Sequence, residues 1–443
     1  MSDSNFTVSI LTLGCRVNQY ESDSVASELR KNGVSLVPFG EKCDIALINT
    51  CTVTAESDRK CRQMIRRAAS FANKIAVAGC YAQINGDEAA SLPKVVYVCG
   101  NSGKASLSET IMALLRGEFI GQVNDVTPPT DPKSAQMFLD TPMRTRSYIK
   151  IEDGCDNRCA YCIISTARGP VRSKSPETVI QEARILSKDT HELILTGIET
   201  AAYGADFPTR RPYGHALADL ICEVDSIDTV RRIGLGSLDP TVMSEYFVGK
   251  IKSAEKILPH FHLSIQSGSS KILASMRRKY NSEMALSAIE RMKSALPGVT
   301  FSCDMIVGFP GETEEDFIET VEFCRKVRFL HLHIFPYSRR GGTEAEKMPD
   351  QVPENVKHER AAELERIGSE IKTELLCDYV SAHSTDTSPV YVLAEKSRQG
   401  LTSGHSEHFV EVKIRDCTAK IGEIIPVILE SSDGEYCYGR KTI

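Results

Sequence analysis

The sequence predicts an α/β protein in three parts: an N-terminal domain with a parallel sheet, a central partial barrel of six strand–helix units, and a small antiparallel β-barrel. Three observations support this. Strand-like and amphipathic segments alternate over most of the chain. The final stretch contains mainly β-type runs. The length of 443 residues fits about three domains at roughly 150 residues each.

The N-terminal part, residues 1–120, begins with short runs rich in β-branched residues. Three strand candidates are FTVSILTLG, DIALINT and KIAVAG, and helical segments such as SVASELRKN lie between them. Such alternation is typical of a parallel sheet with crossover helices. The proline-containing run VTPPTDPKSAQ at 126–136 then predicts a linker, which we place at 121–142.

Residues 143–373 predict the central barrel. Helical stretches separate six strand candidates, which are RSYIKIED, HELILTGI, VRRIGLGSL, HFHLSIQ, TFSCDMIVGF and FLHLHIFPY. A closed barrel of this type needs eight units, so six units predict an open, partial barrel.

A charged amphipathic stretch, ENVKHERAAELERIGSEIKTELL, leads to the C-terminal part at 374–443. Four β-type runs there are SPVYVLAE, HFVEVKIR, EIIPVILES and YCYGRK. They predict the small antiparallel barrel.

The composition bounds the class of protein. The N-terminus, MSDSNFTVSI, lacks a basic stretch followed by an apolar core, and no apolar run approaches the roughly 20 residues of a membrane helix, so we expect a cytoplasmic protein without a membrane span. Fifteen cysteines in a reducing compartment suggest metal ligation before disulfides. The net charge of −6 does not indicate a nucleic-acid-binding protein. A polyanion would therefore have to bind at local basic patches.

The first cysteine group lies in GCDNRCAYC, where Cys155, Cys159 and Cys162 directly follow a strand candidate. Thiolates at this short spacing suit an iron–sulfur cluster or zinc. Because no further Cys or His follows closely, one metal coordination position stays open for a small molecule. A redox or zinc loop remains the alternative from spacing alone.

This CxxxCxxC triplet, in the first loop of a partial barrel, resembles the hallmark of the radical S-adenosylmethionine (SAM) superfamily. The resemblance implies a [4Fe-4S] cluster whose free iron chelates SAM and helps to release a 5'-deoxyadenosyl radical. It also implies SAM-binding positions. Tyr161 would face the adenine, and the strings LTGIE and IVGFPGET would supply Gly197, Glu199 and Gly308. Ser264 and Gln266 in HLSIQSGS are further candidates, because they can point into the mouth of the barrel. Turn-forming glycines and ordinary strand-end polar groups are the alternative for these positions.

The second cysteine group is Cys15, Cys51 and Cys80. Each follows a strand candidate and precedes a helical segment, so all three should meet at the carboxyl edge of one parallel sheet, close to helix N-termini. Cys99 follows the strand-like KVVYV and weakens the argument from spacing. We expect the nine other cysteines to be packing residues, since free cysteine is often buried as a small hydrophobe.

The strings around this second group, TLGCRVNQYES, NTCTVTAESDRKCRQ and AGCYAQ, resemble the N-terminal domain of the methylthiotransferases. The resemblance covers nearly the whole chain and implies a second [4Fe-4S] cluster and a C-terminal TRAM module. NQYES, ARGPVRSK and LTGIETAAYG resemble the subfamily that acts on threonylcarbamoyladenosine in tRNA. Ser165 departs from the proline that is common in the family.

The resemblance implies methylthiolation of C2 of N6-threonylcarbamoyladenosine at position 37 of tRNA, with two SAM molecules, by a protein that we expect to be a monomer. Isopentenyladenosine in tRNA and an aspartate of a ribosomal protein are alternative substrates. An RNA-binding iron–sulfur sensor without turnover is the alternative of another class. The sulfur and electron donors are not identified by the sequence.

Four basic residues are predicted RNA contacts. Arg168 and Arg172 flank the loop that carries Cys155, Cys159 and Cys162, which we call the radical loop. Lys396 and Arg398 lie in the C-terminal part. Basic clusters can pair with phosphates. For any single arginine, packing of its stem against the protein is the alternative.

Overall fold

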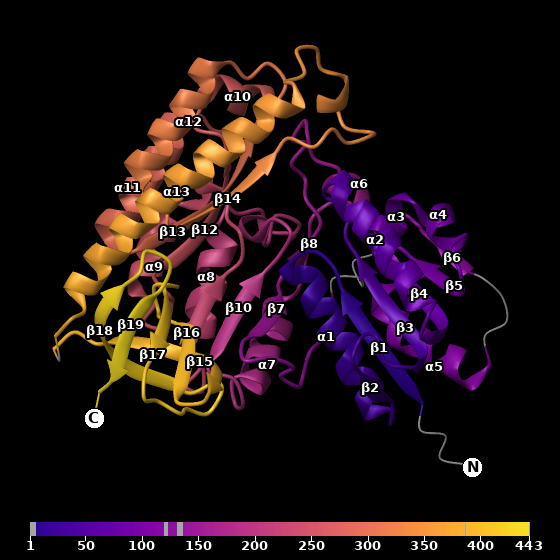
Figure 1. Cartoon of the computed structure of the whole chain (residues 1–443). Helices are drawn as coiled ribbons and strands as arrows, with labels where there is room; N and C mark the ends of the chain where they lie inside the picture. The colour runs from indigo at the N-terminus through magenta and orange to yellow at the C-terminus, as the bar shows by residue number, and fades with distance from the viewer. Residues whose placement is uncertain (1–5, 119–122, 131–135, 386, 443) are drawn as a thin grey trace.

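The computed structural model describes residues 6–118, 123–130, 136–385 and 387–442. Figure 1 shows three bodies in chain order: an N-terminal α/β domain, a central sheet covered by helices on its outer side, and a small barrel at the C-terminus. Within the described ranges, no helix combines the length and the apolar character needed to cross a lipid bilayer.

The N-terminal domain is a six-stranded sheet in the order β2-β1-β3-β4-β5-β6, with every pair parallel. This confirms the predicted parallel sheet. The strands are β1 Thr7–Thr12, β2 Ser35–Val37, β3 Cys43–Thr50, β4 Ala72–Gly79, β5 Val95–Cys99 and β6 Val123–Asp125. The helices are α1 Arg16–Lys31, α2 Ala55–Ala68, α3 Cys80–Ile84, α4 Gly86–Ala90 and α5 Leu107–Arg116.

Three of these helices begin at or within four residues of a predicted cluster cysteine. Cys15 is the N-cap of α1, and Cys80 is the first residue of α3. Helix α2 starts four residues after Cys51, where the Thr54 hydroxyl caps it by accepting a hydrogen bond from the Ser57 N–H at 3.1 Å. Because β1, β3 and β4 are neighbours in the sheet, these three helix starts lie at one edge.

The central region consists of two three-stranded parallel sheets, β7-β10-β11 and β12-β13-β14. A bridge between Leu238 and Leu263 joins them, so the six strands follow one another in chain order. The strands are β7 Ser147–Lys150, β10 Glu192–Thr196, β11 Arg232–Leu235, β12 His260–Gln266, β13 Thr300–Val307 and β14 His331–Pro336. The predicted partial barrel is confirmed.

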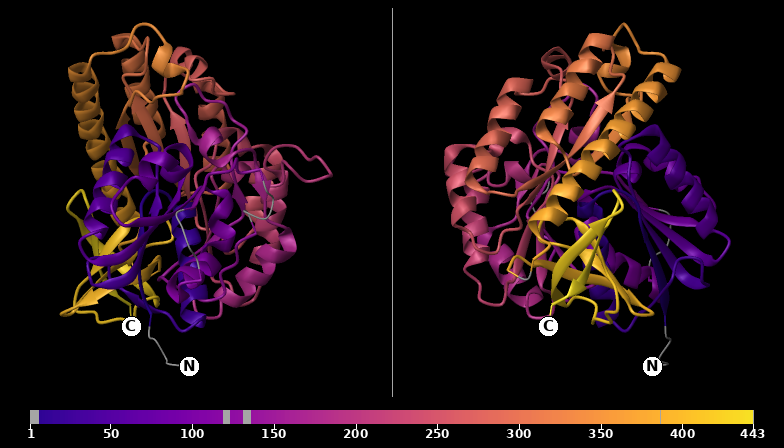
Figure 2. Two further views of the ribbon diagram at one scale, coloured as in Figure 1. Left: turned by 90° about the vertical axis from the view of Figure 1, so that its right-hand side faces the viewer. Right: turned by 60° about the vertical axis from the view of Figure 1, so that its left-hand side comes forward.

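Helices cover the outer side of this partial barrel (Figure 2). They are α7 Pro176–Leu186, α8 His215–Asp225, α9 Glu245–Ser253, α10 Ser270–Ser275, α11 Ser282–Ala295 and α12 Glu314–Val327. A short antiparallel pair, β8 Glu152–Asp153 with β9 Arg172–Ser173, frames the loop that carries the radical cysteines and helix α6 Ile164–Arg168.

Helix α13, Glu354–Ala382, runs along the central sheet to the C-terminal barrel (Figure 1). The barrel closes in the order β15-β16-β17-β19-β18. Its strands are β15 Val390–Arg398, β16 Leu401–His405, β17 Glu411–Ile414, β18 Ile424–Ser432 and β19 Cys437–Lys441. A small barrel is confirmed, with two differences: β16 was not among the predicted strands, and β17 pairs with β19 in parallel.

The predicted domain limits stay predictions. Helix α13 continues without a break across the limit placed at 373/374. Strand β6, which pairs with β5, falls within the predicted linker 121–142. Residues 121, 122 and 131–135 of that linker lie outside the described residues.

Candidate active site

The radical cysteines lie on one loop, between β8 and α6, at the edge where the central strands end. Cys155, Cys159 and Cys162 line a cavity of about 670 Å³, whose other walls include Gly169, Pro170 and the segment 342–344. Gly154 opens the loop at φ +90°, and a Cβ there would lie 2.0 Å from the Pro170 carbonyl oxygen. The backbone therefore turns at a place that only glycine fits.

A buried arginine approaches this loop from the segment between α10 and α11. The Arg278 Nη1 group donates a hydrogen bond to Cys159 Sγ at 3.4 Å, and Nη2 forms an ion pair with Asp239 at 2.8 Å. Both charged side chains are buried. The cavity lined by three cysteines, with a fixed cation beside one of them, fits a thiolate-bound cluster, which carries negative charge.

Of the predicted SAM-binding residues near β10, Glu199 lies in a buried acidic group with Asp239. Burial, with Asp239 adding to it, raises the pKa of the Glu199 carboxyl to about 7. Asn157 and Tyr213 both donate hydrogen bonds to the Glu199 carboxyl, at 3.4 Å and 3.1 Å. Gly197 has a packing reason, because a Cβ there would lie 2.0 Å from Glu152 Oε1. A carboxylate at this edge suits a cationic ligand, and the roles of Glu199 and Gly197 stay predictions.

The other predicted SAM positions also make structural contacts. The Ser264 hydroxyl donates to the Leu238 carbonyl at 3.2 Å. Gln266 adopts φ +77° and is buried. Gly308 adopts φ +72°, and a Cβ there would lie 2.3 Å from Lys357 Cγ. Tyr161 is half-buried, close to Cys159 and Arg278. Contact of these four residues with SAM stays a prediction.

The N-terminal cysteines come together from three elements. A Cβ on Gly14 would lie 2.8 Å from Cys51 Cβ, so the turn that carries Cys15 abuts Cys51. Burial raises the pKa of the Cys51 thiol to about 11, and the nearby Cys80 and Cys15 add to that rise. Cys51 and Cys80 are buried, whereas Cys15 is exposed.

Within the described ranges, no three Cys, His, Asp or Glu side chains are already gathered around one point, as ligands of a single ion would be. In a four-iron cluster each thiolate binds a different iron, so its sulfurs lie further apart than that. Next to Cys80, four buried cations outnumber two carboxylates in one network of the described residues: Arg168, Lys104, Lys150 and Arg172 pair with Glu21 and Asp153. A surplus of buried positive charge fits an anionic group at the cysteines.

Two predicted RNA contacts are not available at the surface. Arg168 is 0% exposed and Arg172 is 4% exposed. Arg172 donates to the carbonyls of Arg168 and Pro170 at 2.8 and 2.7 Å. The prediction that these two side chains contact RNA is therefore wrong for this structure. Glu21, a buried carboxylate that holds Arg168, lies 147 residues away in the sequence, so the sequence did not indicate this role.

The other two predicted RNA contacts, Lys396 and Arg398, are exposed on β15, and their role stays a prediction. The barrel carries a further group of basic and aromatic residues, in which the pairing of the basic residues with tyrosines was not predicted. Lys413 lies over the Tyr436 ring at 3.3 Å, and Arg415 lies 5.1 Å from the centre of the Tyr438 ring. Arginine, lysine and aromatic faces together suit single-stranded RNA.

Arg278, Asp239 and Arg340 are site residues that sequence reasoning missed as such. Arg340 pairs with Asp58 at 2.5 Å and also donates to Thr52, which ties the segment beside the radical cavity to the segment after Cys51. Nothing in the sequence separates Arg278 from its neighbour Arg277, which is exposed and pairs with Glu344.

Two family models match the chain. The model described as "Radical SAM superfamily" matches residues 149–324, and the model described as "Uncharacterized protein family UPF0004" matches residues 7–100. Each match contains one of the two cysteine groups.

Curated relatives match over nearly the full length. A Bacillus subtilis protein named threonylcarbamoyladenosine tRNA methylthiotransferase MtaB is 35% identical, over 98% of this chain and 96% of that protein. A Thermotoga maritima protein of the same name is 36% identical, over 91% and 90%. A Pelotomaculum thermopropionicum protein named tRNA-2-methylthio-N(6)-dimethylallyladenosine synthase is 33% identical, over 94% of each chain.

Among solved structures, the radical SAM methyltransferase TsrM from Kitasatospora setae, with cobalamin and a [4Fe-4S] cluster bound, is similar in fold. The TM-score is 0.53 at 14% identity, over 74% of this chain and 75% of that chain. At this identity the likeness concerns the fold alone.

Proposed function

This chain belongs to the tRNA methylthiotransferases of the radical SAM superfamily, and from that premise we propose that its substrate is N6-threonylcarbamoyladenosine at position 37 of tRNA. The enzyme uses SAM and two [4Fe-4S] clusters. The proposed product carries a methylthio group on C2 of the adenine. The observation that carries the proposal is full-length similarity, at 35% and 36% identity, to two relatives named for this substrate.

The two cysteine groups have separate tasks in this proposal. Cys155, Cys159 and Cys162 hold the cluster that binds SAM, and Cys15, Cys51 and Cys80 hold the second cluster. When bound, the first cluster and SAM supply a radical, which an adenine C2–H bond requires because it offers neither a leaving group nor an acidic proton. The chain itself positions these groups and excludes water.

Several contacts of the chain support a shared active site. Helix α3, which begins at Cys80, packs against α6, which begins two residues after Cys162. Arg340 adds a second tie between the two regions through Asp58. Sites held together in this way can act in turn on one substrate, because their separation is fixed.

The C-terminal barrel is the proposed holder of tRNA. Lys396 and Arg398 are exposed there, and Lys413 and Arg415 lie on the rings of Tyr436 and Tyr438. We propose that the protein acts as a monomer in the cytoplasm, where tRNA is used. Reduction and sulfur supply are left to donors that no feature of the chain identifies.

Isopentenyladenosine in tRNA is the second candidate substrate, because a relative named for the dimethylallyladenosine product is 33% identical over 94% of each chain. The two substrates share the adenine and differ in the group on N6. Two other functions are methylthiolation of a ribosomal-protein aspartate and RNA binding by an iron–sulfur sensor without turnover. Either of them must also account for the two cysteine groups.

Nucleoside analysis of bulk tRNA tests the proposal. In a strain without the gene, threonylcarbamoyladenosine should accumulate and its 2-methylthio derivative should disappear, and the wild-type gene but not Cys155→Ala should restore it. Loss of methylthio-isopentenyladenosine instead would favour the second candidate. Unchanged tRNA with an unmodified ribosomal protein would contradict the tRNA proposal and favour the protein substrate. No change in either would favour the sensor.

A further inference from the structure

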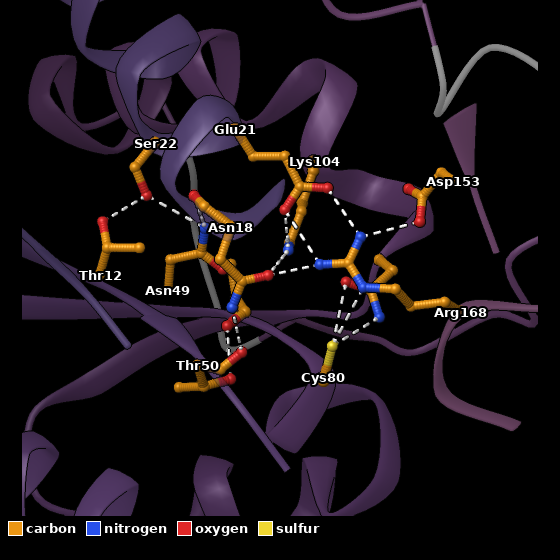
Figure 3. Close-up of polar contacts among 12 residues, drawn as sticks. Thr12, Asn18, Glu21, Ser22, Asn49, Thr50, Cys80, Lys104, Asp153 and Arg168 are labelled. Carbon is orange, nitrogen blue, oxygen red and sulfur yellow. Dashed lines mark hydrogen bonds and ion pairs between the residues drawn. The ribbon is translucent and has the colours of Figure 1, made fainter. Parts of the chain in front are cut away.

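Arg168 lies where the two cysteine regions meet. It is the last residue of α6, six residues after Cys162, and its side chain is fully buried. Figure 3 shows its guanidinium between Cys80 on one side and the carboxylates of Glu21 and Asp153 on the other. Burial of an arginine is costly unless each charge and donor is satisfied, so this placement needs an explanation.

The contact with Cys80 is direct. Arg168 Nε donates to Cys80 Sγ at 3.3 Å, and Asn101 Nδ2 donates to the same sulfur at 3.7 Å. Hydrogen bonds from a charged donor are the stronger kind. Cys80 is one of the three proposed ligands of the N-terminal cluster, yet the strongest donor to its sulfur comes from the radical SAM region.

The remaining nitrogens of Arg168 are held from two segments, β8 and α1. Nη1 donates to Asp153 of β8 at 2.8 Å and to Glu21 of α1 at 3.0 Å. Nη2 donates to Glu21 at 3.3 Å and to Asn18 Oδ1. The planar fork of an arginine suits such multiple contacts, and a lysine could not reproduce them.

Among the described residues, positive groups outnumber carboxylates in the ion pairs of this network. Lys104 and Lys150 also contact Glu21, and Arg172 contacts Asp153, so four cations pair with the two carboxylates of Glu21 and Asp153. Burial raises the pKa of Glu21, but Arg168, Lys104 and Lys150 outweigh that effect and hold the pKa well below its usual range. Glu21 therefore stays ionised, and Arg168, which it holds, contacts the Cys80 sulfur.

We propose that Arg168 is a positioning residue that fixes Cys80 against the radical loop and raises the reduction potential of the N-terminal cluster. Hydrogen bonds to sulfur and nearby positive charge favour the reduced, more negative form of a cluster. The inference rests on the proposed function in one respect, the assignment of a cluster to Cys15, Cys51 and Cys80. Through Arg168, the radical SAM region would then influence the reduction potential of the N-terminal cluster.

The test uses the full chain with Cys155, Cys159 and Cys162 replaced by alanine, which we expect to hold only the N-terminal cluster. Arg168→Gln is added to this background and compared with Lys104→Gln, which removes one positive charge from the same network without touching a cysteine. After anaerobic reconstitution and iron counting, the midpoint potential is measured by dithionite titration followed by electron paramagnetic resonance.

We expect a more negative midpoint potential in Arg168→Gln, and a smaller shift in Lys104→Gln. Equal shifts would overturn the proposal, because charge alone would explain them, and so would an unchanged potential at full iron content. Should Arg168→Gln lose its fold, the double variant Glu21→Gln with Arg168→Gln replaces the buried pair by neutral groups of similar shape. The double variant keeps the net charge of the network, so it isolates the lost hydrogen bond to Cys80. It must still show a negative shift, and an unchanged potential there also overturns the proposal.

The experiment distinguishes failure of the cluster assignment in the proposed function from failure of this inference alone. A background variant that binds no iron would overturn the assignment of the N-terminal cluster and this inference with it. An iron-loaded background whose potential ignores Arg168 would overturn this inference alone.

Discussion

The two cysteine sites differ in how the chain builds them. Cys155, Cys159 and Cys162 share one loop and line an open cavity of about 670 Å³. Cys15, Cys51 and Cys80 come from three separate helix starts along one sheet edge, and two of them are buried. A site on one loop depends on local backbone geometry, whereas a site on three elements depends on the whole sheet.

The sites also differ in the origin of the arginine that contacts a cysteine. Arg278, which donates to Cys159 at 3.4 Å, comes from the same partial barrel as that cysteine. Arg168, which donates to Cys80 at 3.3 Å, comes from the other region. The radical SAM region therefore supplies the arginine that contacts a cysteine of the N-terminal site. The arginine that contacts Cys159 does not come from the N-terminal domain.

The largest expected effect separates the two tasks. Cys159→Ala should abolish both formation of 5'-deoxyadenosine from SAM and methylthiolation of tRNA. Cys80→Ala should abolish methylthiolation but keep deoxyadenosine formation. Each loss should exceed the roughly 10- to 100-fold cost of losing an outer-shell partner of a metal ligand. Chromatography with mass spectrometry measures both products, and loss of deoxyadenosine in Cys80→Ala would break the comparison.

The next effect concerns the stability of the open site. Arg278→Gln leaves the buried Asp239 without its ion pair, and breaking such a pair costs about 3–5 kcal/mol. Its neighbour Arg277 is the matched control, because its pair with Glu344 is exposed and is worth about 0–1 kcal/mol. Urea denaturation of the iron-free protein gives the free energies of unfolding. Equal losses in Arg278→Gln and Arg277→Gln would contradict this account.

A smaller effect compares one glycine beside each site. Gly14 and Gly342 have φ of +104° and +86°, so alanine at either position is strained by about 1–3 kcal/mol. A Cβ on Gly14 would also meet Cys51 at 2.8 Å, whereas one on Gly342 would meet Ile163 only at 3.6 Å. We expect Gly14→Ala to lose iron from the N-terminal site and Gly342→Ala to keep its iron. Iron loss in both variants would remove the difference.

Strands with an apolar, β-branched pattern were predictable, and β16 shows where that ends. Its sequence, LTSGH, has little of this pattern, and it becomes a strand because β15 and β17 pair with it on both sides. The parallel pairing of β17 with β19 closes the barrel. Barrel closure is a property of the whole fold, so no local pattern reveals it.

At the site, residue types were predictable but partners were not. The string NQYES contains Asn18, Tyr20 and Glu21, and ARGPVRSK contains Arg168 and Lys174. In the structure the two strings contact each other, because Arg168 binds Asn18 and Glu21, and Lys174 donates to the Tyr20 hydroxyl at 2.9 Å. These strings therefore build the contact between the two regions, which sequence spacing alone does not indicate.

The most direct test of two separate cluster sites is the iron count of the anaerobically reconstituted protein. Wild type should hold about eight irons, since each [4Fe-4S] cluster holds four. The variant without Cys15, Cys51 and Cys80 and the variant without Cys155, Cys159 and Cys162 should each hold about half of that, as one remaining [4Fe-4S] cluster. A wild type with one cluster's worth of iron, or a triple variant that keeps the full amount, would contradict the account.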